Sequence, residues 1–496
     1  MLYLSDNNGV LKLTFTPELK SVKTHTVPDW FHDAKLGIFI HLGLFSVPAF
    51  AVIGKDLVNS MKIGPEQHFI NNPYAEWYLN SLRIKESPTY QHHNEVYGAD
   101  FKYDDFIPIF NKEMEKWDPE KWADLFKEIG AKYVVYTTKH GDGFLMWPSK
   151  YPNPKKTNYT AKRNIVGELT RAIKSRDLKM GFYYSSCWDW SFNEIPVTNV
   201  KTFLTNGPTD PEYKEYVNNH WRELIDDYEP SILWSDIGYP PNTNLNELFS
   251  YFYNKISDGV LNDRWIQTSP FFRKLIEFRP TGALISWFGK RMLKKGKDIA
   301  LKPPHYDYLT PEYTQSKEIL EEKWETCRGI GNSFGYNKFE TENEYLTITE
   351  LIHLFVDIVS KNGNLLLNVG PMSDGTIPSL QLERLIGLGK WLEVNGEAIF
   401  KTRPWIIAEG KTMNDLDLRY TQRDDTLYAI ILNKPNESIT INSIIASENT
   451  TIHLLGYNNE LKWYQEGLNL KIILPEKIED FPAYSFKISP QPKKAS

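Results

Sequence analysis

The chain repeats one unit, in which an amphipathic helix is followed at once by a short strand that is apolar almost throughout. In one copy, a helix begins at Asp118–Pro119 and is stopped by Gly130, and the strand Lys132–Thr138 follows. Further copies end in the strands Met180–Ser185, Ser231–Trp234 and Asn364–Val369. Continuous apolarity is typical of strands that are covered on both faces, so the pattern predicts a parallel sheet with helices outside.

A closed α/β barrel of the TIM type is favoured over a doubly wound nucleotide-binding sheet. Gly37–Gly43 and Val260–Arg264 are predicted as further strands, and no strand is followed by G-x-G-x-x-G or by G-x-x-x-x-G-K-[ST]. We therefore predict an N-terminal arm over residues 1–24 and a (β/α) barrel, the catalytic domain, over residues 25–402.

The pattern changes after about Trp405. Seven short β-type runs separated by Asn, Asp, Gly and Pro turns lie between Asp417 and Ser489. This alternation predicts a C-terminal antiparallel β-sandwich over residues 403–496. We expect the polar tail from Pro490 to be loose.

The charge balance excludes some classes of partner. The chain has 57 Lys+Arg against 63 Asp+Glu, a net charge of −6, and no dense basic stripe, which argues against nucleic acid. No apolar run is long enough to span a bilayer, Met1 is not followed by a basic-then-apolar leader, and Cys187 and Cys327 are too few for a disulfide framework. We expect a cytoplasmic protein with no membrane partner, and its oligomeric state stays open.

Polar side chains gather where the predicted strands end. His41, His140 and Asp236 each close a strand, and the third strand leads through Tyr183 toward Asp189. Chemistry in α/β barrels lies at the carboxyl ends of the strands, so we predict that Asp236 is a catalytic nucleophile. A lone Asp in this place is more often a turn or cap residue, and the other strand ends favour the catalytic interpretation.

Such a set of His, acidic and aromatic groups suits a polyhydroxylated ring, whose hydroxyls need oriented partners and whose apolar face needs a wall. The 15 Trp, 28 Tyr and 26 Phe agree with a sugar as the substrate class. No H-x-H or H-E-x-x-H spacing accompanies the two histidines, so we predict neither a metal nor a cofactor.

Segments between about residues 28 and 405 resemble the α-L-fucosidases of glycoside hydrolase family 29. They are WFHDAKLGIFIHLGLFSVP (Trp30–Pro48), EWY (Glu76–Tyr78), TTKHGDGFLMW (Thr137–Trp147), GFYYSS (Gly181–Ser186), ILWSD (Ile232–Asp236), NDRW (Asn262–Trp265), WETCRGIGNSFGYN (Trp324–Asn337), NGNLLLNVGPMSDG (Asn362–Gly375) and NGEAIF (Asn395–Phe400). The resemblance implies a barrel followed by a β-sandwich, as the pattern of elements already predicts.

The resemblance also implies residue roles. It places the nucleophile on Asp236 with the indole of Trp234 beside it, Arg264 near the nucleophile, and Phe334 as a wall for the fucose methyl group. The residues that match those holding the fucose hydroxyls in the family are His41, Glu76, Trp77, His140 and Tyr183.

One position departs from the family pattern. Relatives usually carry two adjacent His residues where this chain has His140 and Gly141. The missing imidazole removes one hydrogen bond to the sugar, worth about 1 kcal/mol, unless water or a neighbouring side chain replaces it.

The acid/base residue is implied by the run Asp307–Tyr313, which resembles the family context D-[FY]-x-T-x-E-Y and favours Glu312. Glu277 is a competitor, whereas Glu318, Glu321 and Glu322 fit a solvated helix face better. The insertion at residues 266–304, which includes Trp287, is a candidate lid.

These features together predict a retaining, exo-acting α-L-fucosidase that acts on fucosylated oligosaccharides or glycoconjugates by double displacement. The alternatives are a retaining glycosidase for a related sugar such as an α-L-galactoside, and a non-catalytic fucose-binding protein. Linkage and aglycone preference stay open.

Overall fold

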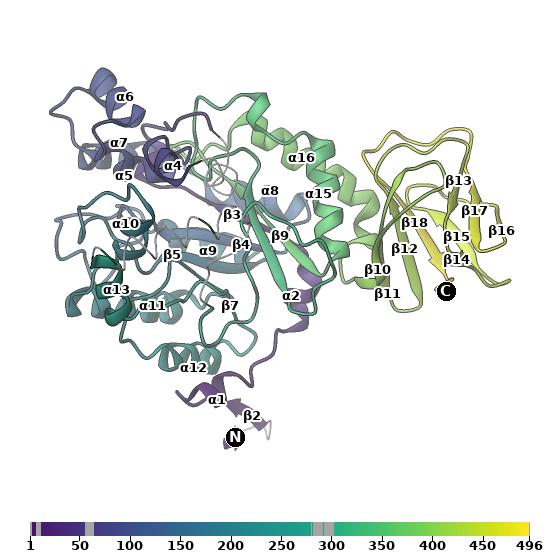
Figure 1. Ribbon diagram of the computed structural model, residues 1–496, viewed down its shortest axis with the longest axis horizontal. Coiled ribbons are helices and arrows are strands. Elements are labelled where there is room, and N and C mark those ends of the chain that lie inside the picture. The colour runs from purple at the N-terminus through teal and green to yellow at the C-terminus, as the bar shows by residue number, and fades with distance from the viewer. Residues whose placement is uncertain are drawn as a thin grey trace.

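The computed structural model describes residues 2–5, 11–54, 64–278, 280, 291 and 302–495. A curled parallel sheet wrapped by helices forms the larger part of the molecule, and antiparallel sheets at the C-terminal end lie beside it (Figure 1). The predicted fold class, a TIM-like barrel followed by an antiparallel β-sandwich, is confirmed.

The parallel sheet has seven strands in the order β7-β6-β5-β4-β3-β9-β8. Their bounds are β3 (Leu36–Ile40), β4 (Tyr133–Lys139), β5 (Lys179–Ser185), β6 (Ile232–Asp236), β7 (Val260–Leu261), β8 (Trp324–Gly329) and β9 (Gly363–Val369). The side chains of β3, β4 and β9 are buried along the whole strand, because helices cover the outside and the barrel interior covers the inside.

An irregular segment closes the barrel between β7 and β8. Tyr308 pairs with Asn262, and Leu309 pairs with Trp324, in isolated parallel bridges. The N–H of Leu309 donates to Lys323 at 3.0 Å. Residues 307–313 thus occupy the eighth strand position, which places Glu312 at the carboxyl ends of the neighbouring strands.

Most helices surround the sheet (Figure 1). They are α1 (Leu19–Val22), α2 (Asp29–Ala34), α4 (Pro65–Ile70), α5 (Tyr78–Leu82), α6 (Pro88–Tyr97), α7 (Phe106–Glu113), α8 (Pro119–Glu128), α9 (Ile165–Lys174), α10 (Val200–Thr205), α11 (Pro211–Tyr228), α12 (Leu245–Lys255), α13 (Pro270–Glu277), α15 (Ile348–Ser360) and α16 (Ser379–Asn395). The Asp118 side chain caps α8 by accepting from the N–H of Glu120, and Gly130 follows the helix with a φ of 88°, as the sequence predicts.

The C-terminal part contains three antiparallel sheets, ordered β10-β11-β12-β18-β15, β13-β17-β16 and β14-β19. The strands are β10 (Arg403–Lys411), β11 (Asp417–Arg423), β12 (Thr426–Ile431), β13 (Ser438–Ile441), β14 (Ile444–Ile445), β15 (Thr451–Leu454), β16 (Trp463–Glu466), β17 (Asn469–Ile473), β18 (Tyr484–Ser489) and β19 (Lys493–Lys494). The expectation of a loose tail from Pro490 is wrong, because β19 pairs with β14 and the N–H of Ala495 donates to Ser443.

Side chains of α15 and α16 hold the C-terminal sheets against the barrel. The Trp391 indole donates to the Ala483 carbonyl at 2.9 Å, and Arg419 Nε donates to Asp357 Oδ1 at 2.5 Å. At the other end of the chain, β1 (Leu2–Ser5) and β2 (Leu11–Thr14) form an antiparallel hairpin within the segment predicted as an N-terminal arm.

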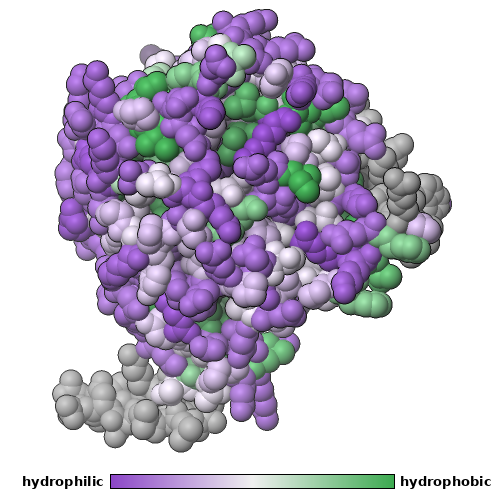
Figure 2. All heavy atoms as spheres, turned by 90° about the vertical axis from the view of Figure 1, so that its left-hand side faces the viewer, coloured by the Kyte–Doolittle hydropathy of each residue, from purple (hydrophilic) through white to green (hydrophobic). Residues whose placement is uncertain are grey.

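The face that carries α5, α10 and α13 is mostly hydrophilic, with hydrophobic residues in small separate groups (Figure 2). Within the described residues, no helix combines the length and apolarity that a membrane crossing requires.

Candidate active site

Asp236 is the last residue of β6, and a sharp turn follows it. Ile237 and Gly238 have φ values of 60° and 90°. A Cβ on Gly238 would lie 2.5 Å from the Ile266 carbonyl oxygen, so both the conformation and the space require glycine there. The turn brings the N–H of Ile237 within 2.9 Å of Asp236 Oδ1. The Asp236 side chain keeps 14% of its surface exposed.

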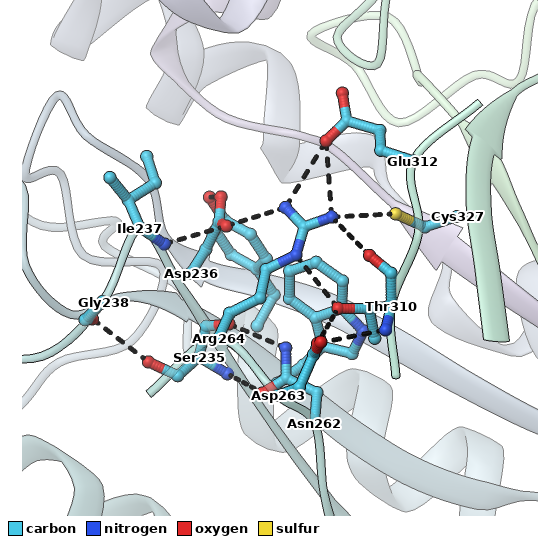
Figure 3. A network of polar contacts seen from close by, with 12 residues as sticks. Ser235, Asp236, Ile237, Gly238, Asn262, Asp263, Arg264, Thr310, Glu312 and Cys327 are labelled. Atoms are coloured by element: carbon cyan, nitrogen blue, oxygen red, sulfur yellow. Dashed lines mark hydrogen bonds and ion pairs between the residues drawn. The ribbon is translucent and has the colours of Figure 1, made fainter. Parts of the chain in front are cut away.

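Arg264 contacts two carboxylates at once (Figure 3). Its Nη1 lies 3.0 Å from Asp236 Oδ1 and 3.4 Å from Glu312 Oε2. Thr310 fixes the guanidinium by accepting from Nε and Nη2, each at 3.0 Å, and the Trp234 ring centroid lies 4.6 Å from Cζ. The predicted nucleophile and the predicted acid/base residue therefore meet at one rigid cation.

Glu312 has surroundings that favour its protonated form. Burial raises the pKa of the Glu312 carboxyl and Asp236 adds to the shift, while Arg264 opposes it. The Tyr74 hydroxyl donates to Glu312 Oε1 at 3.1 Å, and 17% of the side chain is exposed. A carboxyl that holds its proton beside an ion-paired carboxylate is suited to proton donation.

The competing carboxylates are placed elsewhere. Glu277 ends α13, where Arg273 Nε lies 3.0 Å from its Oε1 and 48% of its side chain is exposed. Glu318, Glu321 and Glu322 are exposed, as predicted, but they lie in bends, so the predicted helix is wrong. Trp287 and residues 279, 281–290 and 292–301 of the predicted lid lie outside the described residues.

Two neutral histidines stand side by side at the ends of β3 and β4. The His41 and His140 ring centroids are 5.9 Å apart, and burial lowers the pKa of each imidazole to about 3. His41 Nδ1 lies 2.7 Å from Asn368 Oδ1, whose amide nitrogen donates to the Phe334 carbonyl. Nδ1 of His41 therefore carries the proton, and its Nε2 is left as an acceptor.

Glu76 and Trp77 enter the site from a 3₁₀ turn, Ala75–Trp77. Glu76 Oε2 accepts from the N–H of Gly335 at 2.8 Å, and burial raises the pKa of this carboxyl to about 8 despite that hydrogen bond. The Trp77 ring lies 5.3 Å from that of Trp188, in an edge contact.

Aromatic contacts tie the remaining predicted residues to this cluster. The Tyr183 hydroxyl donates to Asp236 Oδ2 at 2.8 Å, and its ring stacks on His140 at 5.7 Å. The Phe334 ring lies 5.1 Å from the His41 ring and 5.6 Å from the Tyr74 ring. Eight of the ten predicted site residues are thus linked directly by contacts at one end of the barrel, and Glu76 and Trp77 join them through Gly335 and Trp190.

Trp234 makes a contact that the sequence did not suggest, and Asp189 lies apart from the cluster. The Trp234 indole donates to Glu325 Oε1 at 3.1 Å inside the barrel, so its N–H is already paired and its ring supports Arg264 and Tyr183. Asp189 is fully buried and forms an ion pair with Lys139 at 3.1 Å, so it fixes a loop and does not reach the cluster.

The sequence analysis missed Tyr74, Glu325 and Asn368. Glu325 and Asn368 belong to buried strands. A polar side chain buried in such a strand needs a hydrogen-bond partner inside the protein, so its presence in the sequence indicates a buried polar contact. Within the described residues, no group of three or more His, Cys, Asp or Glu side chains is arranged to hold a metal ion.

Replacing Glu76 with glutamine should make the stability of the fold less sensitive to a rise in pH between about 4.5 and 8. The folded protein holds this proton up to about pH 8, whereas the unfolded chain releases it near the ordinary value of 4.5, so wild-type stability falls as pH rises between these values. The fall amounts to about 1.4 kcal/mol for each pH unit, before other groups are counted. Thermal unfolding from pH 5 to 9 should therefore show an advantage of Glu76→Gln over the wild type that grows up to about pH 8 and then levels off.

The exposed residue Glu95 provides the matched control, because Glu95→Gln should follow the wild type at every pH. An unfolding curve of Glu76→Gln that runs parallel to the wild type across this range would contradict the buried, protonated carboxyl.

Comparison with known proteins matches the chain over most of its length. The family model for α-L-fucosidase matches residues 3–397, and the model for the α-L-fucosidase C-terminal domain matches residues 411–489. The α-L-fucosidase of Dictyostelium discoideum is 30% identical, covering 97% of this chain and 95% of its own. The human tissue α-L-fucosidase is 32% identical, covering 93% and 88%.

Solved structures agree with the sequence relatives. The Thermotoga maritima α-fucosidase in complex with fucose is 39% identical, covers 96% of this chain and 100% of its own, and superposes with a TM-score of 0.80. The same enzyme in complex with a mechanism-based inhibitor gives a TM-score of 0.81 at 39% identity, covering 96% and 99%. The chain therefore belongs to the α-L-fucosidase family of glycoside hydrolases.

Proposed function

We propose that the protein is a retaining, exo-acting α-L-fucosidase that releases terminal α-L-fucosyl groups from oligosaccharides or glycoconjugates by double displacement. The observation that carries this proposal is the guanidinium of Arg264, whose Nη1 contacts Asp236 at 3.0 Å and Glu312 at 3.4 Å. Because Asp236 Oδ1 and Glu312 Oε2 both contact this one nitrogen, the two carboxyl groups must lie close to each other. Retaining glycosidases hold their carboxyl groups about 5–5.5 Å apart, and inverting enzymes about 6.5–9.5 Å.

The first step would use both carboxyl groups. Asp236 attacks the anomeric carbon as the bond to the aglycone breaks, and protonated Glu312 gives its proton to the departing oxygen. Arg264 orients the Asp236 carboxylate through an ion pair at 3.0 Å. In the second step Glu312 removes a proton from water, which attacks the fucosyl-enzyme from the face that the aglycone left.

The sugar-binding roles follow from the chemistry of the cluster. His41 Nε2 is an acceptor, and the Tyr183 hydroxyl and Glu76 offer further polar atoms near Asp236. The Phe334 ring would contact the fucose methyl group. Because His41, Glu76 and Phe334 are all buried, the arrangement suits a sugar that enters end-on, which supports terminal fucose as the substrate.

The two alternatives have less support. A fucose-binding protein without activity has no need of two carboxylates bridged by one Arg. An α-L-galactoside differs from a fucoside by one hydroxyl on the carbon that faces the apolar wall, and such a wall discriminates by only about 1–3 kcal/mol. We therefore expect weak hydrolysis of α-L-galactosides beside the main activity.

Hydrolysis of 4-nitrophenyl α-L-fucoside, followed by nitrophenolate release and by proton NMR, tests the proposal. The first sugar formed should be α-L-fucose, with the β anomer appearing later by mutarotation, because two inversions restore the configuration. Initial release of β-L-fucose would show an inverting enzyme. Binding of L-fucose without hydrolysis of any fucoside would favour the binding protein, and faster cleavage of the L-galactoside would reverse the substrate assignment.

A further inference from the structure

Asp263, the residue before Arg264, binds Thr310 through one carboxylate oxygen (Figure 3). The N–H of Thr310 donates to Asp263 Oδ1 at 3.0 Å, and the Thr310 hydroxyl donates to the same oxygen at 2.5 Å. Asp263 follows the short strand β7, whereas Thr310 belongs to the segment 307–313 that closes the barrel. The carboxylate thus ties the end of β7 to the segment that carries Glu312.

These side-chain bonds continue a contact that begins as backbone pairing. At the start of the segment, the N–H of Asp307 donates to the Leu261 carbonyl of β7 at 2.9 Å. At Thr310 the pattern changes, because its N–H donates to the Asp263 side chain and its carbonyl accepts from Arg264 Nη2 at 3.0 Å. Two side chains therefore hold the segment here, two residues before the predicted acid/base residue.

The Thr310 hydroxyl satisfies both neighbours in one orientation. The Nε–H of Arg264 is a donor and lies 3.0 Å from Thr310 Oγ1, so the hydroxyl oxygen accepts there. The single hydroxyl proton is then left for Asp263, whose carboxylate oxygen is an acceptor. Asp263 therefore sets the direction in which the hydroxyl oxygen receives the guanidinium.

The two predicted catalytic carboxyl groups depend on the place of this guanidinium. Arg264 Nη1 lies 3.0 Å from Asp236 and 3.4 Å from Glu312, so a rotation of the guanidinium would change both contacts. Thr310 is buried, so solvent does not readily replace a bond that its hydroxyl loses. A change at Asp263 should therefore reach the reacting groups.

We propose that Asp263 is a positioning residue, which acts through Thr310 to hold the Arg264 guanidinium and the segment of Glu312 in their working places. This inference rests on the proposed function, because it assigns Asp263 to the double-displacement reaction. Its effect should appear most strongly where proton donation by Glu312 limits the rate.

The first test compares Asp263→Ala with the wild type on an α-L-fucosyl-galactose disaccharide and on 4-nitrophenyl α-L-fucoside, each at its optimal pH. On the disaccharide, which needs the proton, Asp263→Ala should lower kcat/KM about 100-fold. On the nitrophenyl fucoside, which needs only a well-placed Asp236, the loss should be about 10-fold. Loss of stability alone would lower both values by the same factor.

Asp263→Asn is the conservative variant, since its amide oxygen can still accept from the N–H and the hydroxyl of Thr310. It should recover most of both losses at its own optimal pH.

Asp258→Ala is the matched control, because Asp258 lies just before β7 as Asp263 lies just after it. Its half-exposed carboxylate pairs with Lys179. This variant should leave kcat/KM unchanged on both substrates.

The second test asks whether Asp263 acts through the Thr310 hydroxyl. Thr310→Val should lower kcat/KM on the disaccharide about 10-fold, and Thr310→Ser, which keeps the hydroxyl, should stay within about threefold of the wild type. The double variant Asp263→Ala/Thr310→Val should lose about as much as Asp263→Ala alone. Independent effects would instead multiply to about 1000-fold.

Three results would overturn the inference. They are wild-type kinetics of Asp263→Ala, equal losses on the two substrates, and losses that multiply in the double variant. If Asp263→Ala does not fold, the two Thr310 variants still decide, since equal kinetics of Thr310→Val and Thr310→Ser would contradict the inference. Each result requires an active wild type, whereas failure of the proposed function means that the wild type itself cleaves no α-L-fucoside.

Discussion

Asp236→Ala should lose nearly all turnover of α-L-fucosides while the protein stays folded. Without its carboxylate, no fucosyl-enzyme forms, and we expect kcat to fall by about 10⁴-fold or more. The Asp236 side chain is partly exposed and lies at the end of β6, outside the packed core, so thermal unfolding should change little. The measurements are the initial rate with 4-nitrophenyl α-L-fucoside and a thermal unfolding curve.

Azide should restore part of this activity and identify the lost step. The small anion fits the space of the removed carboxylate and attacks the anomeric carbon directly, with one inversion, so the product should be β-L-fucosyl azide. Asp100→Ala changes an exposed aspartate and serves as the control that keeps wild-type rates. Turnover of Asp236→Ala near the wild-type level, or a rescued product of α configuration, would contradict the nucleophile assignment.

Glu312→Ala should lose activity unevenly between substrates. A sugar alcohol needs a proton to leave, whereas nitrophenolate departs without one. For an α-L-fucosyl-galactose disaccharide we expect a loss of about 10²- to 10⁴-fold in kcat/KM, and a much smaller loss for the nitrophenyl fucoside.

The second half of the reaction should also slow in this variant. Glu312 is proposed to activate water, so the fucosyl-enzyme should accumulate and nitrophenolate should appear as an initial burst. Azide needs no general base, and it should relieve this step and give α-L-fucosyl azide, the retained anomer.

Glu277→Ala is the matched control, since its carboxylate pairs with Arg273 on α13. It should keep wild-type kinetics on both substrates. Equal losses of Glu312→Ala on both substrates, without a burst or an azide effect, would remove Glu312 from the role. If Glu277→Ala instead lost far more activity on the disaccharide than on the nitrophenyl fucoside, Glu277 would be the acid/base residue.

Local patterns in the sequence were enough for the regular part of the barrel. Asp118, Pro119 and Gly130 bound α8 through backbone preferences that act within a few residues, and the apolar runs of β4, β5 and β9 need burial on both faces. Asp236 and Arg264 could be predicted as neighbours, because parallel strands bring their carboxyl ends to one edge.

Strands that depart from these patterns were missed. β8 contains Glu325 and Arg328 and does not read as an apolar run. It is stable inside the barrel because Tyr133 and Trp234 both donate to Glu325, at 2.5 and 3.1 Å. The pairing of β19 with β14 was missed for a similar reason, since backbone hydrogen bonds, and not apolar side chains, tie down the tail.

The sequence by itself predicted the class of fold, the family and the candidate residues of the site, because helix caps, strand burial and motif residues are local properties. Only the tertiary structure decided which groups meet. It placed Glu312 on Arg264 through the irregular segment 307–313, paired the Trp234 indole with Glu325, and set the Trp190 ring over Gly141. These contacts join residues from separate loops and strands, and their distances depend on how the closed barrel packs, which no local pattern encodes.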